Sequence, residues 1–363
     1  MVSDLEASHS DHGPATRVAR TPGPMSTQEL RRLLPSSPVM RRPKRISQSQ
    51  RPVKTPTSLM VDALAPGPDP PPWDRPPQDG PRPGGTWQSV GVPSNVFIEF
   101  EADGPVPATA ARLHAAWGEV LDLPRGVTPE RAARHLALAA RPPHDLDAPK
   151  PYCPGQMNAG HGMISVELRV LDDRLLDALS AWAEWGGVLP IGDGGPRTAT
   201  LIATDMEVLE HATWEEIAAS DGATTWELAI ISPLVMRSRG RAHTDLSPAA
   251  IATSLSSRWR EWAPDTAPWL PEREQFSQVL TTVDRTHPVQ ASLGTERQRG
   301  SRGAAGRTSE AREGQLRISG VDGAEATRVF SQLMALARFT NIGSYANYGM
   351  GVVDVEVVGT SRG

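Results

Sequence analysis

The sequence predicts an α+β protein in which helices pack on antiparallel sheets, and two observations support that fold class. Short segments such as residues 163–170 alternate apolar and polar side chains, which is the period of a half-buried strand. Longer segments such as residues 248–262 and 324–338 repeat apolar residues at helical spacing. An α+β domain with an antiparallel sheet covers the order of these segments best.

The first half has the expected order β-α-β-α-β-β with extra helices. Residues 96–100 have the β-branched and aromatic content of a strand, and residues 108–121 have the spacing of a helix. A second helix over residues 129–140 is expected to begin after Thr128 as its N-cap. The remaining expected elements are a helix that opens at Asp172 and strands over residues 163–170, 198–205 and 225–231. This order predicts a ferredoxin-like domain over residues 92–232.

The second half, residues 233–363, repeats this kind of order without a close sequence repeat. Its expected elements are helices over residues 248–262 and 324–338 and strands near residues 278–284, 316–318 and 352–358. Residues 294–314 are rich in Gly, Arg and Ser and have no periodicity, so they predict a mobile loop. The chain is therefore expected to contain two tandem ferredoxin-like (RRM-like) domains.

Composition along the 363 residues is uneven. Residues 1–91 are rich in Pro, Ser and Arg and predict a disordered tail, because they hold too little apolar surface to offset the entropy of ordering. Ten Lys/Arg and one acid lie between Arg17 and Lys54, so a basic arm that collects a polyanion is the functional alternative. The net charge of −5 indicates no global basic field.

The single cysteine, Cys153, excludes a disulfide framework and a multi-cysteine zinc site. No apolar run reaches the length of a membrane span, and no apolar segment follows the basic residues at the N-terminus. A cytoplasmic protein without a membrane partner is therefore the expectation. The sequence also has no HExxH motif, no paired carboxylates at helical spacing and no Walker loop, which leaves metal hydrolases and nucleotide hydrolases without support.

Three segments together resemble the CRISPR precursor-RNA processing endoribonucleases of the RAMP superfamily. A helix runs into ARFTNIG (337–343) and YGMG (348–351), which is similar to the glycine-rich loop before the last strand of that family. ISPL (231–234) and SLSSRW (254–259) resemble its strand end and a following helix, and KPYCP (150–154) resembles its KPF segment. Asn341 replaces the usual first glycine of the loop, and residues 344–347 lack the common Lys/Arg pair.

The resemblance implies two ferredoxin-like modules that bind RNA, and cleavage of precursor CRISPR RNA within its repeats without a metal or cofactor. The implied partners are CRISPR repeat RNA and other subunits of a CRISPR effector complex. The alternative is a RAMP subunit that binds guide RNA but has no effective histidine. Binding tested against single-turnover cleavage separates the two.

The glycine-rich loop also predicts an RNA contact from its own chemistry. Glycines have no side chains, so their backbone N–H groups can approach phosphates closely, and arginines add cations. Two tyrosines in the loop offer faces on which unpaired bases can stack, although packing on the last strand is the alternative for Tyr348. The RNA-binding candidates are Arg237, Arg239, Arg338, Gly343, Ser344, Tyr345, Tyr348, Gly349 and Gly351.

RNA cleavage without metal requires a base for the 2′-hydroxyl, an acid for the leaving oxygen and a cation for the phosphate. Histidine suits the first two roles because its pKa lies near neutrality. The resemblance implies a histidine shortly before the KPF segment, where His144 lies six residues before Lys150, and His135 is the rival. Lys150 is the candidate cation or a surface residue. His114 is expected to be a partly buried structural residue, and His161 a turn residue.

Overall fold

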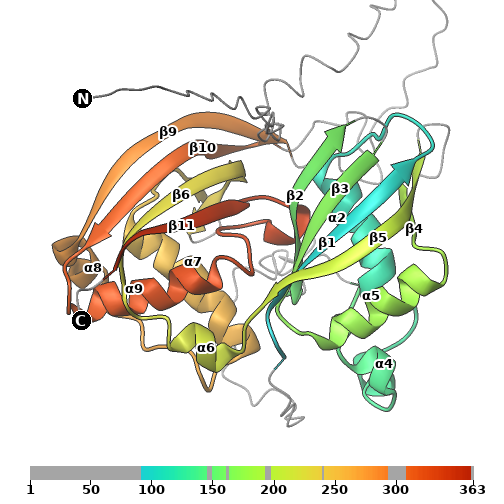
Figure 1. The fold of residues 1–363 in the computed structure, drawn as a ribbon, viewed down its shortest axis with the longest axis horizontal. Helices are drawn as coiled ribbons and strands as arrows, with labels where there is room; N and C mark the ends of the chain where they lie inside the picture. Colours follow the sequence, from blue (N-terminus) through green and yellow to red (C-terminus); the bar gives the residue numbers. More distant parts are fainter. Residues whose placement is uncertain are drawn as a thin grey trace, which may run out of the picture. The chain divides into compact units, whose positions relative to one another are not determined.

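The computed structural model describes residues 91–144, 149–160, 163–192, 198–238, 241–292 and 308–360. The tail expected over residues 1–91, apart from its last residue, lies outside these ranges. So do Arg239, His161 and most of the arginine-rich loop. The described chain forms two antiparallel sheets, each with its own helices (Figure 1).

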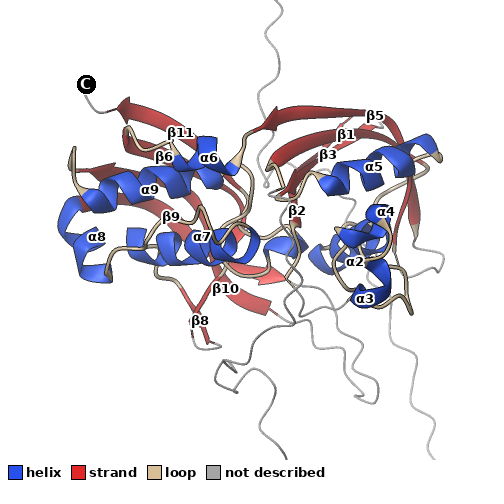
Figure 2. Cartoon of the chain, turned by 90° about the horizontal axis from the view of Figure 1, so that it is seen from below, coloured by secondary structure: helices blue, strands red, loops and turns tan. Residues whose placement is uncertain are grey.

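The first sheet has five strands in the order β2-β3-β1-β5-β4. Helices α2 (Ala110–Leu121) and α5 (Arg174–Glu184) cover one of its faces (Figure 2). Apolar residues of β1 and β3 pack against these helices around Trp117 and form a separate core. The strands of this first sheet are β1 (Ser94–Ala102), β2 (Tyr152–Gly160), β3 (Met163–Val170), β4 (Val188–Ile191) and β5 (Ala199–His211).

The second sheet has four strands in the order β11-β6-β10-β9, and the chain enters it through the short helix α6 (Trp214–Ala218). Helices α7 (Pro248–Trp262), α8 (Arg273–Val279) and α9 (Glu325–Leu336) pack on it around Trp259 and Phe330. The strands are β6 (Ala223–Leu234), β9 (Leu280–Ser292), β10 (Thr308–Gly320) and β11 (Val353–Thr360). A small ribbon of β7 (Met236–Ser238) and β8 (Arg241–His243) follows β6. The predicted fold of two ferredoxin-like domains with antiparallel sheets is confirmed.

Three local predictions are wrong. The strand expected at residues 225–231 was assigned to the first module, but β6 pairs with β10 and β11 of the second sheet. We therefore propose that the second module begins near α6 and β6 rather than at residue 233. The helix expected over residues 129–140 is two separate turns, α3 (Pro129–Ala132) and α4 (Leu136–Ala139). Residues 308–314 of the expected mobile loop form part of β10.

The prediction also missed β2. This edge strand contains Pro154, and its register with β3 shifts between Pro154 and Met157. A proline cannot donate to a ladder of hydrogen bonds, so it is tolerated on an edge strand or at a bulge, where it masks the strand pattern in the sequence.

Candidate functional site

A buried carboxylate organises the first candidate site. Asp122 Oδ1 accepts a hydrogen bond from the Tyr152 hydroxyl at 2.7 Å. Its Oδ2 accepts from Lys150 Nζ at 2.7 Å and pairs with His144 Nδ1 at 3.2 Å. This group of four residues, which we call the Asp122 cluster, joins a helix end, a loop and the start of a strand.

The local sequence explains how the cluster is assembled. Helix α2 ends at Asp122, whose backbone N–H caps the helix by bonding to Gly118 O. The next residue, Leu123, donates its N–H to Pro142 O at 2.8 Å and so holds the returning loop beside the helix end. Lys150, two residues before strand β2 begins, also donates from Nζ to Pro143 O. This bond holds the loop that carries His144 beside the start of the strand. The prolines around His144 thus provide carbonyl acceptors that position the histidine.

Burial separates His144 from the other members of the cluster. The side chain of His144 is 35% exposed, whereas those of Asp122 and Lys150 are 2% and 0% exposed. Burial, followed by the charge and hydrogen bond of Asp122, raises the pKa of Tyr152 far above its usual value, so this phenol stays protonated. In this arrangement His144 is the member of the cluster that can meet a ligand from solvent. The Lys150 side chain, in contrast, is fully buried and bonds to Asp122 inside the cluster, so Lys150 is not a surface residue.

Two other histidines, His135 and His114, have surroundings that differ from those of His144. His135 is an exposed N-cap of α4 and makes no side-chain capping hydrogen bond. His114 is 5% exposed, its Nδ1 lies 3.1 Å from Asn347 O, and its ring stacks on Tyr348 with centroids 4.2 Å apart. Burial lowers the pKa of His114, which fits the predicted buried structural role.

The glycines of the loop adopt backbone conformations that other residues rarely take. Gly343, Gly349 and Gly351 have φ angles of 84°, 77° and 67°. A Cβ on Gly343 would lie 2.5 Å from Val235 O, and one on Gly351 would lie 1.9 Å from Ile342 O. These two glycines therefore allow backbone to approach backbone within the protein.

The amides of the loop are correspondingly used inside the protein. Gly343 N–H donates to Ser254 Oγ at 2.8 Å, Gly349 N–H to Ala346 O at 2.9 Å and Gly351 N–H to Pro233 O at 3.0 Å. Ser344 N–H donates to Val235 O at 2.8 Å. Each of these amides therefore already has a protein acceptor in this structure, and the expectation that they contact phosphates stays a prediction.

The side chains predicted to bind RNA near the loop also have protein contacts. Tyr348 stacks on His114, and Tyr345 packs edge-on against Tyr348 with centroids 5.9 Å apart. Arg237 donates to the Tyr345 hydroxyl, and its guanidinium lies 5.5 Å from the centre of that ring. Arg338 pairs with Glu210 at 2.6 Å. Tyr348 therefore packs on His114 and Tyr345, whereas the alternative expected from the sequence was packing on the last strand.

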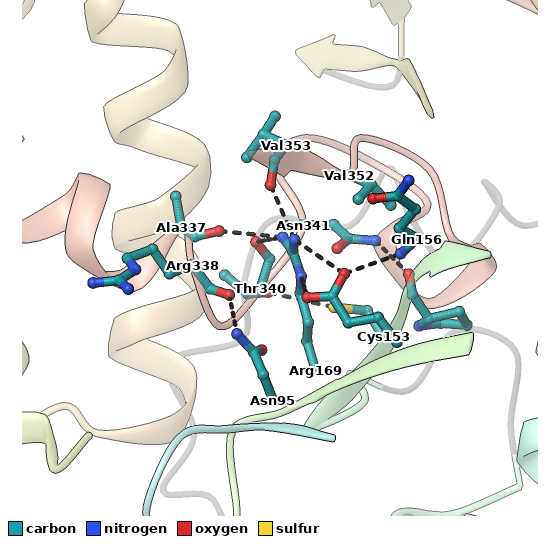
Figure 3. A network of polar contacts seen from close by, with 12 residues as sticks. Asn95, Cys153, Gln156, Arg169, Ala337, Arg338, Thr340, Asn341, Val352 and Val353 are labelled. Carbon is teal, nitrogen blue, oxygen red and sulfur yellow. Dashed lines mark hydrogen bonds and ion pairs between the residues drawn. The ribbon is translucent and has the colours of Figure 1, made fainter. Parts of the chain in front are cut away.

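A network of polar contacts joins the first module to the glycine-rich loop (Figure 3). Arg169, 5% exposed on β3, donates to Ala337 O and Thr340 O at 3.3 Å and to Val353 O at 2.9 Å. Asn95 Nδ2 donates to Arg338 O at 2.9 Å. The bonds to Ala337 O and Arg338 O satisfy carbonyls that the end of α9 leaves without helical partners, and the bond to Val353 O reaches strand β11. The guanidinium of Arg169, which also pairs with Glu167 at 2.9 Å, therefore lies at the negative end of the α9 dipole.

Asn341 shows why the loop tolerates the loss of its usual first glycine. Its Nδ2 donates to Pro154 O at 2.9 Å and to Ala346 O at 3.3 Å. The first bond connects the loop to strand β2, and the second connects two positions within the loop. In the arginine-rich segment, Arg312 pairs with Asp284 at 3.0 Å across β9 and β10. The other four arginines of this segment, Arg297, Arg299, Arg302 and Arg307, lie outside the described residues.

Sequence reasoning missed Asp122 and Arg169. Neither lies in one of the recognised segments, and a lone carboxylate after a helix or a lone arginine on a strand is an ordinary surface residue by pattern. The available signal for Asp122 was its place at the C-terminus of a helix, where a negative charge is unfavourable unless a cation compensates it.

In the ranges that the structure covers, no three His, Cys, Asp or Glu side chains are grouped so as to hold a metal ion. Among the same residues, no helix has both the length and the apolar character required to cross a membrane.

Comparison with known proteins finds the family signature in the second module. Residues 228–353, from β6 to the start of β11, match the family described as CRISPR-associated endoribonuclease Cas6. No curated protein sequence matches the chain at a significant level.

Solved structures extend the likeness to both modules. A Cas6 (TTHB231) product complex is 21% identical with a TM-score of 0.54, and the match covers 73% of this chain and 100% of that one. A Thermus thermophilus Cas6 is 19% identical with a TM-score of 0.50, over 74% of this chain and 100% of that one. A Cas6 (TTHA0078) product complex is 16% identical with a TM-score of 0.51, over 73% and 99%. The resemblance to the CRISPR precursor-RNA processing endoribonucleases is confirmed: residues 228–353 carry the Cas6 family pattern, on a fold that both modules share with Cas6 structures.

Proposed function

We propose that the protein is an endoribonuclease that cleaves CRISPR repeat RNA in precursor transcripts, and that His144 carries the proton transfer. The observation that carries the proposal is the Asp122 cluster, in which one partly exposed imidazole is oriented by a buried carboxylate. The family pattern in residues 228–353 supports the substrate class.

The reaction is an attack of a 2′-hydroxyl on the adjacent phosphate. The Nδ1–H of His144 donates a hydrogen bond to Asp122 Oδ2, so the unprotonated Nε2 is the base that accepts the proton of the 2′-hydroxyl. The 2′-oxygen then bonds to phosphorus, the bond to the 5′-oxygen breaks, and that oxygen takes a proton from water. The hydroxide so formed is neutralised by the proton that His144 carries, which regenerates the base. The products are a 2′,3′-cyclic phosphate and a 5′-hydroxyl.

Asp122 and Lys150 act on this step through His144. The Asp122 carboxylate stabilises the imidazolium that forms when Nε2 takes the proton, and it holds the ring in one orientation. Lys150 and Tyr152 bond to the same carboxylate and fix its position. Because the Lys150 side chain is fully buried, we assign it a positioning role in place of a direct contact with the phosphate.

The direct test is cleavage of RNA from the repeat array of the source organism in excess chelator. The expected result is a single cut within the repeat, with a cyclic phosphate on one product and a 5′-hydroxyl on the other. A strict requirement for magnesium would overturn the mechanism. Tight binding without single-turnover cleavage would favour the alternative, a RAMP subunit that holds guide RNA.

A pair of histidine variants tests the assignment of the base. His144→Ala is expected to slow cleavage roughly 10²- to 10⁴-fold, the usual contribution of a general base, with unchanged RNA affinity. His135→Ala is the matched control, because His135 is exposed and makes no side-chain capping bond. If His135→Ala lost cleavage and His144→Ala kept it, the assignment would move to His135.

A further inference from the structure

A cavity of about 950 Å³ lies between the glycine-rich loop, helix α7 and the segment that leads into β2. Lys150 and Asn347 line it where it approaches the Asp122 cluster, and Gly343 and Ser344 line it on the loop side. Helix α7 supplies a row of hydroxyls, from Thr253, Ser254 and Ser257, and the guanidinium of Arg258. Except for Thr253, these residues belong to the SLSSRW segment, whose chemistry the proposed cleavage does not use.

The charged side chains that line the cavity have interaction partners except at one position, and they include the carboxylate of Glu261, three residues after Arg258 on the same helix. Arg273 pairs with Asp245 at 2.6 Å, and Lys150 pairs with Asp122. Arg237 bonds to Tyr345. Arg258 is only partly exposed, and within the described residues its guanidinium makes no ion pair and no hydrogen bond.

The surroundings of Arg258 make this lack of a partner costly. Burial lowers the pKa of the Arg258 guanidinium, and the group that acts on it electrostatically is the thiol of Cys153. Burial raises the pKa of that thiol, so it is neutral at pH 7 and supplies no compensating charge. A partly buried cation without an anion is unfavourable in a free protein, and a bound anion would remove the penalty.

We propose that Arg258 is the phosphate-binding residue of a backbone subsite for RNA in this cavity. The inference rests on the proposed function for the identity of the ligand. Arginine presents a planar fork that matches two phosphate oxygens, and the hydroxyls of Ser254 and Ser257 lie on the same helix as further polar contacts. The cavity is larger than a single phosphate requires, and Lys150 connects it to the Asp122 cluster. A strand that occupies it would therefore run toward His144.

The test uses the full chain and repeat RNA with a 2′-deoxy nucleotide at the cleavage position, so that binding is measured without cleavage. Arg258→Met removes the charge with little loss of volume, and Arg258→Lys keeps the charge but removes the fork. Arg260→Met is the matched control, because Arg260 is an exposed arginine on the same helix that does not line the cavity.

Arg258→Met is expected to weaken RNA binding roughly 10- to 100-fold at low salt, as for loss of a charge-assisted hydrogen bond. The slope of log affinity against log salt should fall in magnitude by about 0.7, the value for one phosphate of a single strand. Arg258→Lys should keep most of the salt slope and lose part of the affinity. The unfolding temperature of free Arg258→Met should equal or exceed that of the native chain, because an unpaired partly buried charge is gone.

Three outcomes would overturn the inference. The first is RNA affinity in Arg258→Met that matches Arg260→Met. The second is a marked fall in the unfolding temperature, since that indicates a structural role. The third is stabilisation of the native chain by inorganic phosphate with no RNA binding, since the subsite would then serve a small anion. A native chain that binds the RNA without cleaving its ribonucleotide form refutes the proposed cleavage alone, and the Arg258 variants still decide the subsite.

Discussion

The two modules have related topologies but use their polar groups in opposite ways. In the first module, the Asp122 cluster leaves one imidazole partly exposed beside a buried carboxylate. In the second module, the glycine-rich loop uses the amides of Gly343, Gly349 and Gly351 for bonds within the protein. The glycine-rich loop, which carries the resemblance to the Cas6 family, thus lies at a structural joint between the two modules. The candidate chemistry lies 207 residues away in sequence, from His144 to Gly351.

The joint matters for chemistry because it fixes where the two modules meet. Arg169 and Asn95 of the first module hold carbonyls at the end of α9, and Asn341 of the loop returns a bond to β2. His114 of α2 stacks on Tyr348 beside the same loop. Rigid support of this kind preserves the geometry that proton transfer requires. The following variants test whether the loop is a joint rather than a ligand site.

The largest effect is expected for Gly351→Ala. The new Cβ would lie 1.9 Å from the carbonyl oxygen of Ile342, and φ is 67°, so both a clash with backbone and left-handed strain oppose the substitution. We expect a loss of at least about 3 kcal/mol in the free energy of unfolding, measured by urea denaturation.

Gly349→Ala is the matched control for strain without a clash. Its φ is 77°, but the nearest atom to a new Cβ, a carbon of Pro154, is 3.6 Å away. The expected cost is about 1 to 2 kcal/mol, the penalty of left-handed backbone alone. Equal stabilities for the two variants would contradict the role of Gly351 in close backbone packing.

The next effect is expected for Arg169→Met. The substitution leaves the carbonyls of Ala337, Thr340 and Val353 without this donor in a buried place, at a cost of roughly 3 kcal/mol. Because these bonds join the modules, we expect unfolding followed by circular dichroism and by tryptophan fluorescence to give separate transitions.

Arg317→Met provides the comparison on an exposed strand. Arg317 pairs with Glu227 at 3.2 Å, and both side chains are about half exposed, so the pair is expected to contribute less than about 1 kcal/mol. If Arg169→Met cost no more than Arg317→Met and kept a single transition, the network in Figure 3 would not couple the modules.

The same comparison explains what the sequence could predict. Helical periodicity located α7 at its observed bounds, because a serine cap and a proline mark its start and Trp259 marks its buried face. The strand β6 was assigned to the wrong sheet, since pairing partners are a long-range property that alternation does not encode. The Asp122 cluster was predicted in part, through His144 and Lys150. Its centre, Asp122, was missed because three hydrogen bonds to one carboxylate become visible only when loop, helix and strand meet.

The smallest effect concerns the pH dependence of stability at His114. Burial lowers its pKa in the folded protein below the usual 6.5, with Lys150 and His144 lowering it further and Asp122 and the Asn347 carbonyl opposing them. As pH falls below about 6.5, the unfolded chain takes up this proton first, so the folded state loses relative stability. His114→Phe keeps a ring that can stack on Tyr348 but does not titrate. The drop in unfolding temperature between pH 7.5 and pH 5.5 should therefore be smaller in His114→Phe than in the native chain. The control His287→Phe changes an exposed histidine and should keep the native drop. Parallel curves for all three proteins would mean that His114 titrates alike in the folded and unfolded chain, and that its burial at the joint has no electrostatic consequence.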